Sequence, residues 1–198
     1  MGNKEALLRG ALECLLEKGY ARTTARDVAS RSKTSLAAIG YHFGSTEHLL
    51  NEAIADGFRL WRRHIATVLA ANAGRPAEDV LEIVGEELSR LFEEHRPLLG
   101  VFLEALAMAQ RSPEIREHAA ALYEEERVAI AALLTAIRGE ERGDERIVAS
   151  VVQAVADGLI VQTIVSGADA PSPADVLNVL RPVVLGTVRR PALRSRAR

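Results

Sequence analysis

The chain has 198 residues, of which 48% are hydrophobic, 26% are charged and 4% are aromatic. That length is sufficient for a packed core, and no apolar run approaches the roughly 18 to 20 residues that a membrane span needs. The N-terminus lacks a signal-peptide pattern, and the single cysteine, Cys14, excludes an internal disulfide. We therefore expect a soluble, cytoplasmic protein with no membrane contact.

Charge is distributed unevenly along the chain. The net formal charge of −2 divides into +3 over residues 1–46, −11 over residues 47–180 and +6 over residues 181–198. A phosphate-binding surface needs local positive potential. The basic N-terminal segment is therefore a weak indication of a nucleic-acid partner.

Apolar spacing and capping signals predict three short helices and then a longer one in the first part of the chain. The predicted ranges are 4–18, 24–31, 35–43 and a helix from 45 to 71. Gly19 ends the first helix. Thr24 and Asp27, three residues apart, approximate a capping box for the second helix. Ser35 caps the third helix.

The remaining chain is also predicted to be helical. The ranges are 77–95, 97–110, 113–138, 145–166 and 173–190. Several of these helices have proline at or next to their first turn, where the missing N–H costs nothing. The fold class is therefore all-α with about nine helices. We divide it into a head (residues 1–47), a helical body (residues 48–190) and a basic tail (residues 191–198).

The two short helices at 24–31 and 35–43, joined by a tight turn, predict a helix-turn-helix. In that motif the second helix lies in the major groove of DNA. Ser35, Leu36, Ala37 and Ala38 are the candidates for contacts with base edges. The candidates for the phosphates and the rest of the DNA-binding surface are Thr24, Lys33, Thr34, Tyr41, His42 and Thr46. Phe43 is expected to pack inward.

Residues 23–50, "TTARDVASRSKTSLAAIGYHFGSTEHLL", resemble the DNA-binding signature of the TetR (tetracycline-repressor-like) family of transcriptional regulators. The resemblance covers about residues 5–52. Lys33 stands where the family usually has glycine, so either Lys33 is left-handed or the turn differs. Leu36 stands where lysine is common, which removes a donor to DNA. No Arg, Lys, Asn or Gln lies on the third helix, so we expect readout by methyl contacts, Ser35 and DNA shape.

The resemblance also implies a dimer, built by the last two helices. Those helices have apolar residues on every side, which agrees with burial on more than one face. One face can pack on the protein's own core and another on a partner. The predicted dimer-interface residues are Val148, Val152, Val155, Leu159, Val176, Leu180 and Val184.

The resemblance further implies a small-molecule pocket in the body. For any single aromatic residue, ordinary core packing is the simpler explanation. As a group they are the best candidates for the pocket, which we predict to be lined by Phe58, Trp61, Phe92, Phe102, Met108, Tyr123 and Gln162. The scarcity of buried Lys and Arg favours an apolar or neutral effector.

No catalytic pattern is present, so we expect neither an enzyme nor a cofactor. Glu114 and His118 lie one helical turn apart, as metal ligands do, but no third ligand accompanies them, so we expect no metal. The prediction is a ligand-responsive dimeric repressor that leaves a near-palindromic operator when a small molecule binds. The alternative is a helical dimer whose head makes protein–protein contacts. The basic tail is either a solubilising segment or an auxiliary contact.

Overall fold

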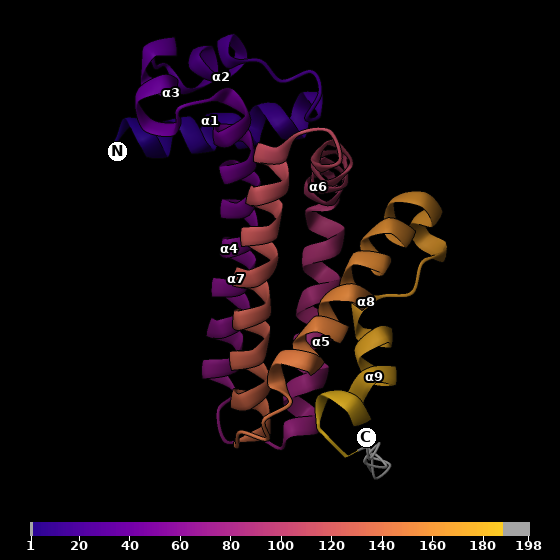
Figure 1. The fold of residues 1–198 in the computed structure, drawn as a ribbon. Coiled ribbons are helices and arrows are strands. Elements are labelled where there is room, and N and C mark those ends of the chain that lie inside the picture. The colour runs from indigo at the N-terminus through magenta and orange to yellow at the C-terminus, as the bar shows by residue number, and fades with distance from the viewer. Residues whose placement is uncertain (1, 188–198) are drawn as a thin grey trace, which may run out of the picture.

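The computed structural model describes residues 2–187, and over that range it contains only helices and their connections (Figure 1). The elements are α1 (Asn3–Lys18), α2 (Ala25–Ser32), α3 (Leu36–Phe43), α4 (Thr46–Ala71), α5 (Ala77–Glu94), α6 (Arg96–Ala109), α7 (Pro113–Arg138), α8 (Glu145–Ser166), the 3-10 turn η1 (Gly167–Asp169) and α9 (Pro173–Val184). The predicted all-α class is confirmed.

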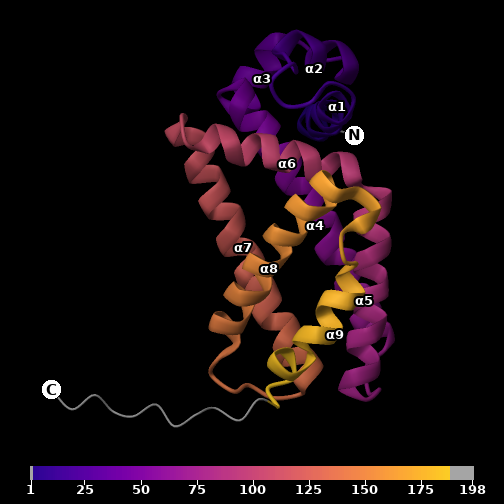
Figure 2. The same cartoon turned by 90° about the vertical axis from the view of Figure 1, so that its right-hand side faces the viewer.

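The three helices α1–α3 gather at one end of the molecule as a head, and α4 runs from them into the body (Figures 1 and 2). In the body α4 packs against α7, α7 packs against α8, and α5 packs against α9. Figure 2 shows α6 lying crosswise beneath the head, where it contacts α1. The head is therefore connected to the body covalently through α4 and also packs on α6.

The head depends on α1, because α2 and α3 have eight residues each and helices that short are not stable alone. Val28 of α2 and Ile39 of α3 are 0% and 3% exposed against the same core. At the crossing of α1 and α2, a Cβ placed on Gly10 would lie 3.0 Å from the Cβ of Ser32 and 3.1 Å from its backbone nitrogen. Only glycine allows this close approach.

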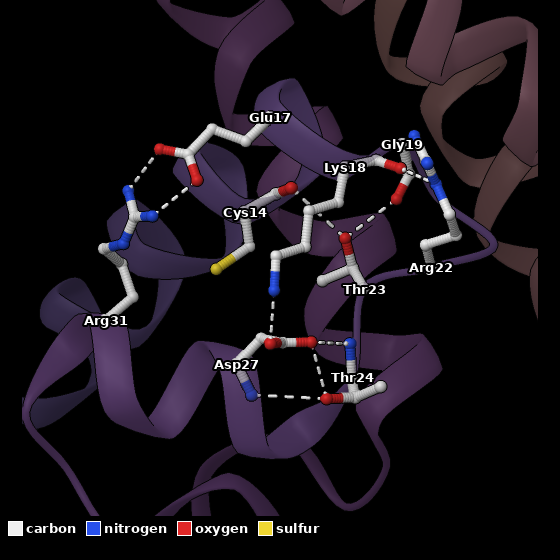
Figure 3. Close-up of polar contacts among 9 residues, drawn as sticks. All are labelled: Cys14, Glu17, Lys18, Gly19, Arg22, Thr23, Thr24, Asp27 and Arg31. Carbon is white, nitrogen blue, oxygen red and sulfur yellow. Dashed lines mark hydrogen bonds and ion pairs between the residues drawn. The ribbon is translucent and has the colours of Figure 1, made fainter.

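A network of polar contacts around Asp27 ties α2 to α1 (Figure 3). The Asp27 carboxylate forms an ion pair with Lys18 and accepts hydrogen bonds from the backbone and hydroxyl of Thr24, at 3.0 and 2.6 Å. In return, the Thr24 oxygen accepts from the Asp27 backbone, which completes the predicted capping box. Lys18 first, and then Thr24, hold the pKa of the Asp27 carboxyl well below its usual range.

A second set of contacts fixes the other end of α2 and the turn before it. Arg31 donates to both carboxylate oxygens of Glu17, at 2.8 and 2.5 Å. The buried hydroxyl of Thr23 donates to the Gly19 carbonyl at 2.8 Å, which satisfies an oxygen at the end of α1. These bonds keep α2 at one fixed position on α1.

The last helix differs from its prediction. We expected it to extend to about residue 190, but α9 ends at Val184 and is followed by Gly186 with a φ of 67°. The physical reason is tertiary. Arg138 donates to the carbonyl of Val184 at 2.6 Å and Arg142 donates to that of Gly186 at 2.9 Å, so α7 and the loop after it cap this end. The predicted tail at 191–198 lies outside the described residues.

One segment of the described chain, Glu145–Asp169, is long and apolar enough to cross a membrane by length and composition alone. This differs from the expectation that no apolar run approaches the length of a membrane span. In the fold, α8 packs along α7 and contributes Ala149, Leu159 and Ile160 to the buried core. The opposite side of α8 is also apolar, but its side chains are exposed.

The network around Asp27 leads to a pH-dependent prediction. Because its pKa is lowered in the folded state, Asp27 contributes stability that is complete above its ordinary pKa of about 3.9 and is lost progressively as the pH falls from this value towards the lower pKa of the folded state. We expect Asp27→Asn to lower the thermal midpoint at pH 7, and the difference from wild type to shrink below about pH 4. Melts followed by circular dichroism measure both.

The control for this experiment is Asp169→Asn. The Asp169 side chain is exposed and makes no hydrogen bond or ion pair with residues 2–187, so its loss should leave the melts unchanged. Equal midpoints for wild type and Asp27→Asn at pH 7 would contradict the role given to Asp27.

Candidate nucleic-acid interface and ligand cavity

The turn between α2 and α3 is formed around Lys33. Its φ of 54° and ψ of 40° are left-handed, and it is the one non-glycine residue with positive φ among residues 2–187. This confirms the first of the two conformations expected where the family has glycine. The Thr34 N–H donates to the Ala29 carbonyl at 3.0 Å, which closes the end of α2. The turn therefore has the tight form that a helix-turn-helix needs.

The outward face of α3 is formed by residues that were predicted to contact DNA. Leu36 and Tyr41 are 50% and 85% exposed, whereas Phe43 is 6% exposed and packs inward as expected. Among the other candidates Thr24, Lys33, Ser35 and Ala37 are exposed, and Thr34, Ala38, His42 and Thr46 are partly buried. The oxygen of Ser35 accepts a hydrogen bond from the Ala38 N–H at 3.2 Å, so this hydroxyl also caps α3.

Two further cations of the head were not among the predicted contacts. Arg26 in the first turn of α2 is exposed and, like Lys33, has no ion pair with any residue of the described chain. The Nζ of Lys4 lies 5.8 Å from the centre of the Phe43 ring, at the other end of α3. The sequence signal for Arg26 was its place two residues after the Thr24 cap. The helix-turn-helix therefore has two exposed cations without an ion-pair partner in the described chain, Arg26 on α2 and Lys33 in the turn.

The body contains a cavity of about 260 Å³ with mainly apolar walls from α4 to α9. The structure brings five of the predicted pocket residues together around it: Phe58, Trp61, Phe92, Phe102 and Tyr123. Their rings form a series. The Trp61 centroid lies 5.9 Å from that of Phe92 and 5.3 Å from that of Phe58, which in turn lies 5.1 Å from Phe102. Phe102 and Tyr123 are 6.4 Å apart.

The other two predicted pocket residues lie elsewhere. Met108 is 39% exposed near the end of α6, and Gln162 is exposed on α8. Neither lines the cavity. Helical phase is the reason, because α8 presents Leu159 and Ile160 to the interior and turns Gln162 away from it.

The cavity wall also contains charged groups and a glutamine that were not among the residues predicted to line it. Arg62 of α4 forms an ion pair with Glu126 of α7 at 2.6 Å. Burial raises the pKa of Glu126 to about 7, although Arg62 opposes this shift. Asp157 of α8 accepts a hydrogen bond from the Tyr123 hydroxyl at 2.8 Å, and burial raises the pKa of this carboxyl as well. Gln153, 8% exposed, donates to the Tyr123 carbonyl at 3.1 Å.

The structure places the predicted dimer-interface residues mainly inside the protomer. Val148 is 6% exposed in the core, and the other six predicted residues line the cavity: Val152, Val155, Leu159, Val176, Leu180 and Val184. Leu159 and Val184, for example, are only 4% and 2% exposed. The α8 side chains pack inside the protomer because α7 covers that side of α8, and the α9 side chains do so because α9 packs against α5.

A second apolar stripe, which we call the outer stripe, runs along the opposite side of α8. It consists of exposed residues spaced alternately four and three apart: Ile147, Val151, Ala154, Gly158, Val161 and Val165. Ile147 and Val165 are 71% and 79% exposed, and Val179 of α9 is 81% exposed. A Cβ on Gly158 would meet no atom of this chain within 4 Å. The outer stripe therefore has no cover within the described protomer.

The head and body also meet through hydrogen bonds. The backbone N–H of Tyr20, in the turn after α1, donates to the carboxylate of Glu104 on α6 at 2.6 Å. The Tyr20 hydroxyl donates to Asn51 of α4 at 3.2 Å. Ser45 before α4 donates to Glu114 of α7 at 2.7 Å. The helices α4, α6 and α7, which also line the cavity, therefore each contact the head through a specific hydrogen bond.

The Glu114 and His118 pair, considered as metal ligands, makes other contacts. Besides the bond to Ser45, the Glu114 carbonyl lies 3.0 Å from Nδ1 of His118, and the His118 ring stands edge-on to that of His48 with centroids 4.2 Å apart. No group of three or more His, Cys, Asp or Glu side chains that could hold a metal ion occurs among residues 2–187.

A helix-turn-helix head on a helical body that encloses a cavity defines a DNA-binding transcriptional regulator. Two family models match the chain. The one described as "Bacterial regulatory proteins, tetR family" covers residues 3–53, and the one described as "BetI-type transcriptional repressor, C-terminal" covers residues 76–187. The second alone covers more than half of the chain. The chain therefore belongs to the TetR family.

Solved structures share this fold over most of their length. A transcriptional regulator from Rhodococcus sp. Rha1 is 22% identical with a TM-score of 0.62, and the match covers 93% of this chain and 95% of that one. The multidrug binding protein EbrR, solved with imidazole, is 24% identical (TM-score 0.64; 98% and 99%). A regulator from Saccharomonospora viridis in complex with choline is 23% identical (0.61; 89% and 94%). No curated protein matches the chain.

Proposed function

We propose that this regulator is a cytoplasmic repressor, which binds a near-palindromic operator as a homodimer and leaves it when a small molecule enters the body. One observation carries the proposal. The head, with its exposed α3, is connected through α4 and α6 to an apolar cavity of about 260 Å³. The match of residues 76–187 to a repressor-type domain supports the sign of the regulation. The alternative of a head that binds proteins is not favoured by the family matches.

In this proposal α3 enters the major groove of the operator. Leu36 and Ala37 contact thymine methyl groups, while Tyr41 and Lys33 contact phosphates at the rim. We add Arg26 to the phosphate contacts, because it is exposed on the same motif and has no carboxylate partner in the described chain. With no bidentate side chain on α3, the specificity comes from methyl contacts, DNA shape and the spacing of two heads.

The dimer in this proposal forms through the outer stripe of α8, together with Val179 of α9. Apolar side chains at alternating spacings of four and three residues are typical of packed helix pairs. Ala154 and Gly158, near the middle of the stripe, leave room for a partner helix to approach closely. A two-fold axis along this face gives each dimer two heads, which matches the two half-sites of a palindrome.

The effector in this proposal occupies the aromatic cavity. Two regulators of similar fold were solved with small molecules, imidazole in EbrR and choline in the regulator from Saccharomonospora viridis. Phe102 lies in the cavity wall, and two residues further along α6 the Glu104 carboxylate holds the Tyr20 N–H of the head. A shift of α6 on ligand binding therefore moves the head and changes the spacing of the two α3 helices.

The operator proposal is tested by a mobility-shift titration with sites selected from randomised DNA, repeated at several salt concentrations. We expect a near-palindromic site whose affinity falls steeply as salt rises. Tyr41→Ala should weaken binding to every site by a similar factor of about three to ten, because a phosphate contact carries no sequence information. Leu16→Ala, on an exposed part of α1, serves as the control.

No shifted band at any salt concentration would contradict DNA binding. A Tyr41→Ala protein that prefers a different sequence, with its overall affinity unchanged, would contradict the phosphate contact.

The dimer proposal predicts that Val161→Glu yields monomers in sedimentation velocity. In the dimer a carboxylate within the outer stripe would be buried without a partner, which costs several kcal/mol. The matched control is Gln162→Glu, which introduces the same charge at the next residue, exposed and off the stripe. An intact Val161→Glu dimer would place the interface elsewhere.

The coupling through α6 predicts that Glu104→Ala loosens the head without affecting the dimer. Hydrogen exchange of the Tyr20 amide should become roughly tenfold faster, because it loses a charged acceptor. Operator affinity should fall with it. Glu104→Gln keeps an acceptor at the same place and should stay close to wild type. Unchanged exchange in Glu104→Ala would rule out this bond as a connection.

A further inference from the structure

We propose that the effector of this regulator is a lipophilic monocation, whose apolar body lies on the aromatic wall of the cavity and whose positive charge is held at Asp157. The inference rests on the proposed function, because it assigns a chemical class to the molecule that enters the cavity. It differs from the expectation from the sequence, which was an apolar or neutral effector, because the sequence did not show that Asp157 faces the cavity.

The first observation is the charge balance of the cavity wall. Three charged side chains line the cavity. Arg62 and Glu126 neutralise each other at 2.6 Å. Asp157 forms no ion pair with any of residues 2–187, and the Tyr123 hydroxyl, at 2.8 Å, is a neutral donor. The wall therefore has a net charge of −1 when all three groups are ionised.

The second observation is the position of that charge. The series of rings from Phe92 through Trp61, Phe58 and Phe102 leads to Tyr123, and the Tyr123 hydroxyl is the group that donates to Asp157. Aromatic faces attract cations as well as apolar groups. One side of the cavity thus offers a continuous surface for an apolar body, with a carboxylate at its end.

The third observation is the free-energy cost of an ionised Asp157 that has no cation nearby. A carboxylate that is partly removed from water, without a cation nearby, is destabilised in its charged form, and burial does raise the pKa of this group. A bound cation offsets that cost, and a neutral molecule of the same shape does not. An anionic molecule would be repelled. The cavity wall therefore favours a cationic ligand over a neutral one and a neutral ligand over an anionic one.

Gln153 contributes to this arrangement as a positioning residue. Its side-chain amide donates to the Tyr123 carbonyl at 3.1 Å, from the turn of α8 that precedes Asp157. With Gln153 and Asp157 on one helix both bonded to Tyr123, the phenol ring is fixed between α7 and α8. The carboxylate is thus presented to the cavity in a defined orientation.

The test compares two probes of the same shape, benzyltrimethylammonium and its uncharged carbon isostere neopentylbenzene. Trp61 is the single tryptophan of the chain and lies in the cavity wall, so its fluorescence reports occupancy without reference to DNA. We expect the full-length protein to bind the cation at least about tenfold more tightly than the isostere, as for other contacts with a charged group.

Asp157→Asn assigns the preference to one residue. Asparagine keeps the shape and an acceptor for the Tyr123 hydroxyl but removes the charge, so the affinity for the cation should fall about tenfold and that for the isostere should stay the same. The control, Asp169→Asn, removes the same charge from the exposed η1 turn and should change neither affinity. Asp157→Glu restores the charge and should retain the preference.

Equal affinities for the two probes in the wild-type protein, or no change in Trp61 fluorescence with either of them, would overturn the proposal, and neither result depends on the folding of a variant. A preference that survives Asp157→Asn would overturn the role of that carboxylate. Mobility shifts on the same preparations test operator binding separately from the chemical class of the effector. Intact operator binding without cation preference refutes only the ligand class, whereas loss of operator binding refutes the proposed function.

Discussion

The head depends on the carboxylate of Asp27, because this one group both begins α2 and holds it on α1. It caps the first turn of α2 through Thr24, and it binds Lys18 at the end of α1. Neither α2 nor α3 is long enough to form alone. The orientation of α3 in the head therefore depends on the position of α2 on α1. The same ion pairs also determine which cations of the head remain available. Lys18 and Arg31 are held by carboxylates, whereas Arg26 and Lys33 are not.

The helices could be predicted from the sequence because their starts are determined locally. Thr24, Ser35, Ser45, Ser112 and Ser172 each cap the helix that follows, and each accepts a hydrogen bond from a backbone N–H three residues on. Such signals lie within one turn of chain. The predicted end of α9 was wrong because it is determined by contacts that are distant in the sequence. Its terminal carbonyls bind Arg138 and Arg142, which are more than forty residues away in the sequence.

The faces of α8 show where pattern reasoning fails. The predicted dimer residues Val148, Val152, Val155 and Leu159 follow the same spacing as the outer stripe, one position along. A helix that is apolar on every side contains two such stripes, and its sequence does not state which one meets the protein's own core. Packing on α7 and α9 makes that choice. The charged residues of the cavity escaped prediction similarly, since an acidic residue on a helix is usually solvated, and only the tertiary fold turns Asp157 inward.

The bond between Glu104 and the head has an evolutionary consequence, because the donor is a backbone N–H. No substitution at Tyr20 other than proline removes that donor. The residue before it, Gly19, has a φ of 77°, and a Cβ there would lie 3.0 Å from both Glu104 carboxylate oxygens, which leaves little freedom at that position. Variation in the strength of the connection must therefore arise on α6. The exposed surface of α3 can therefore diverge while this contact between head and body stays the same.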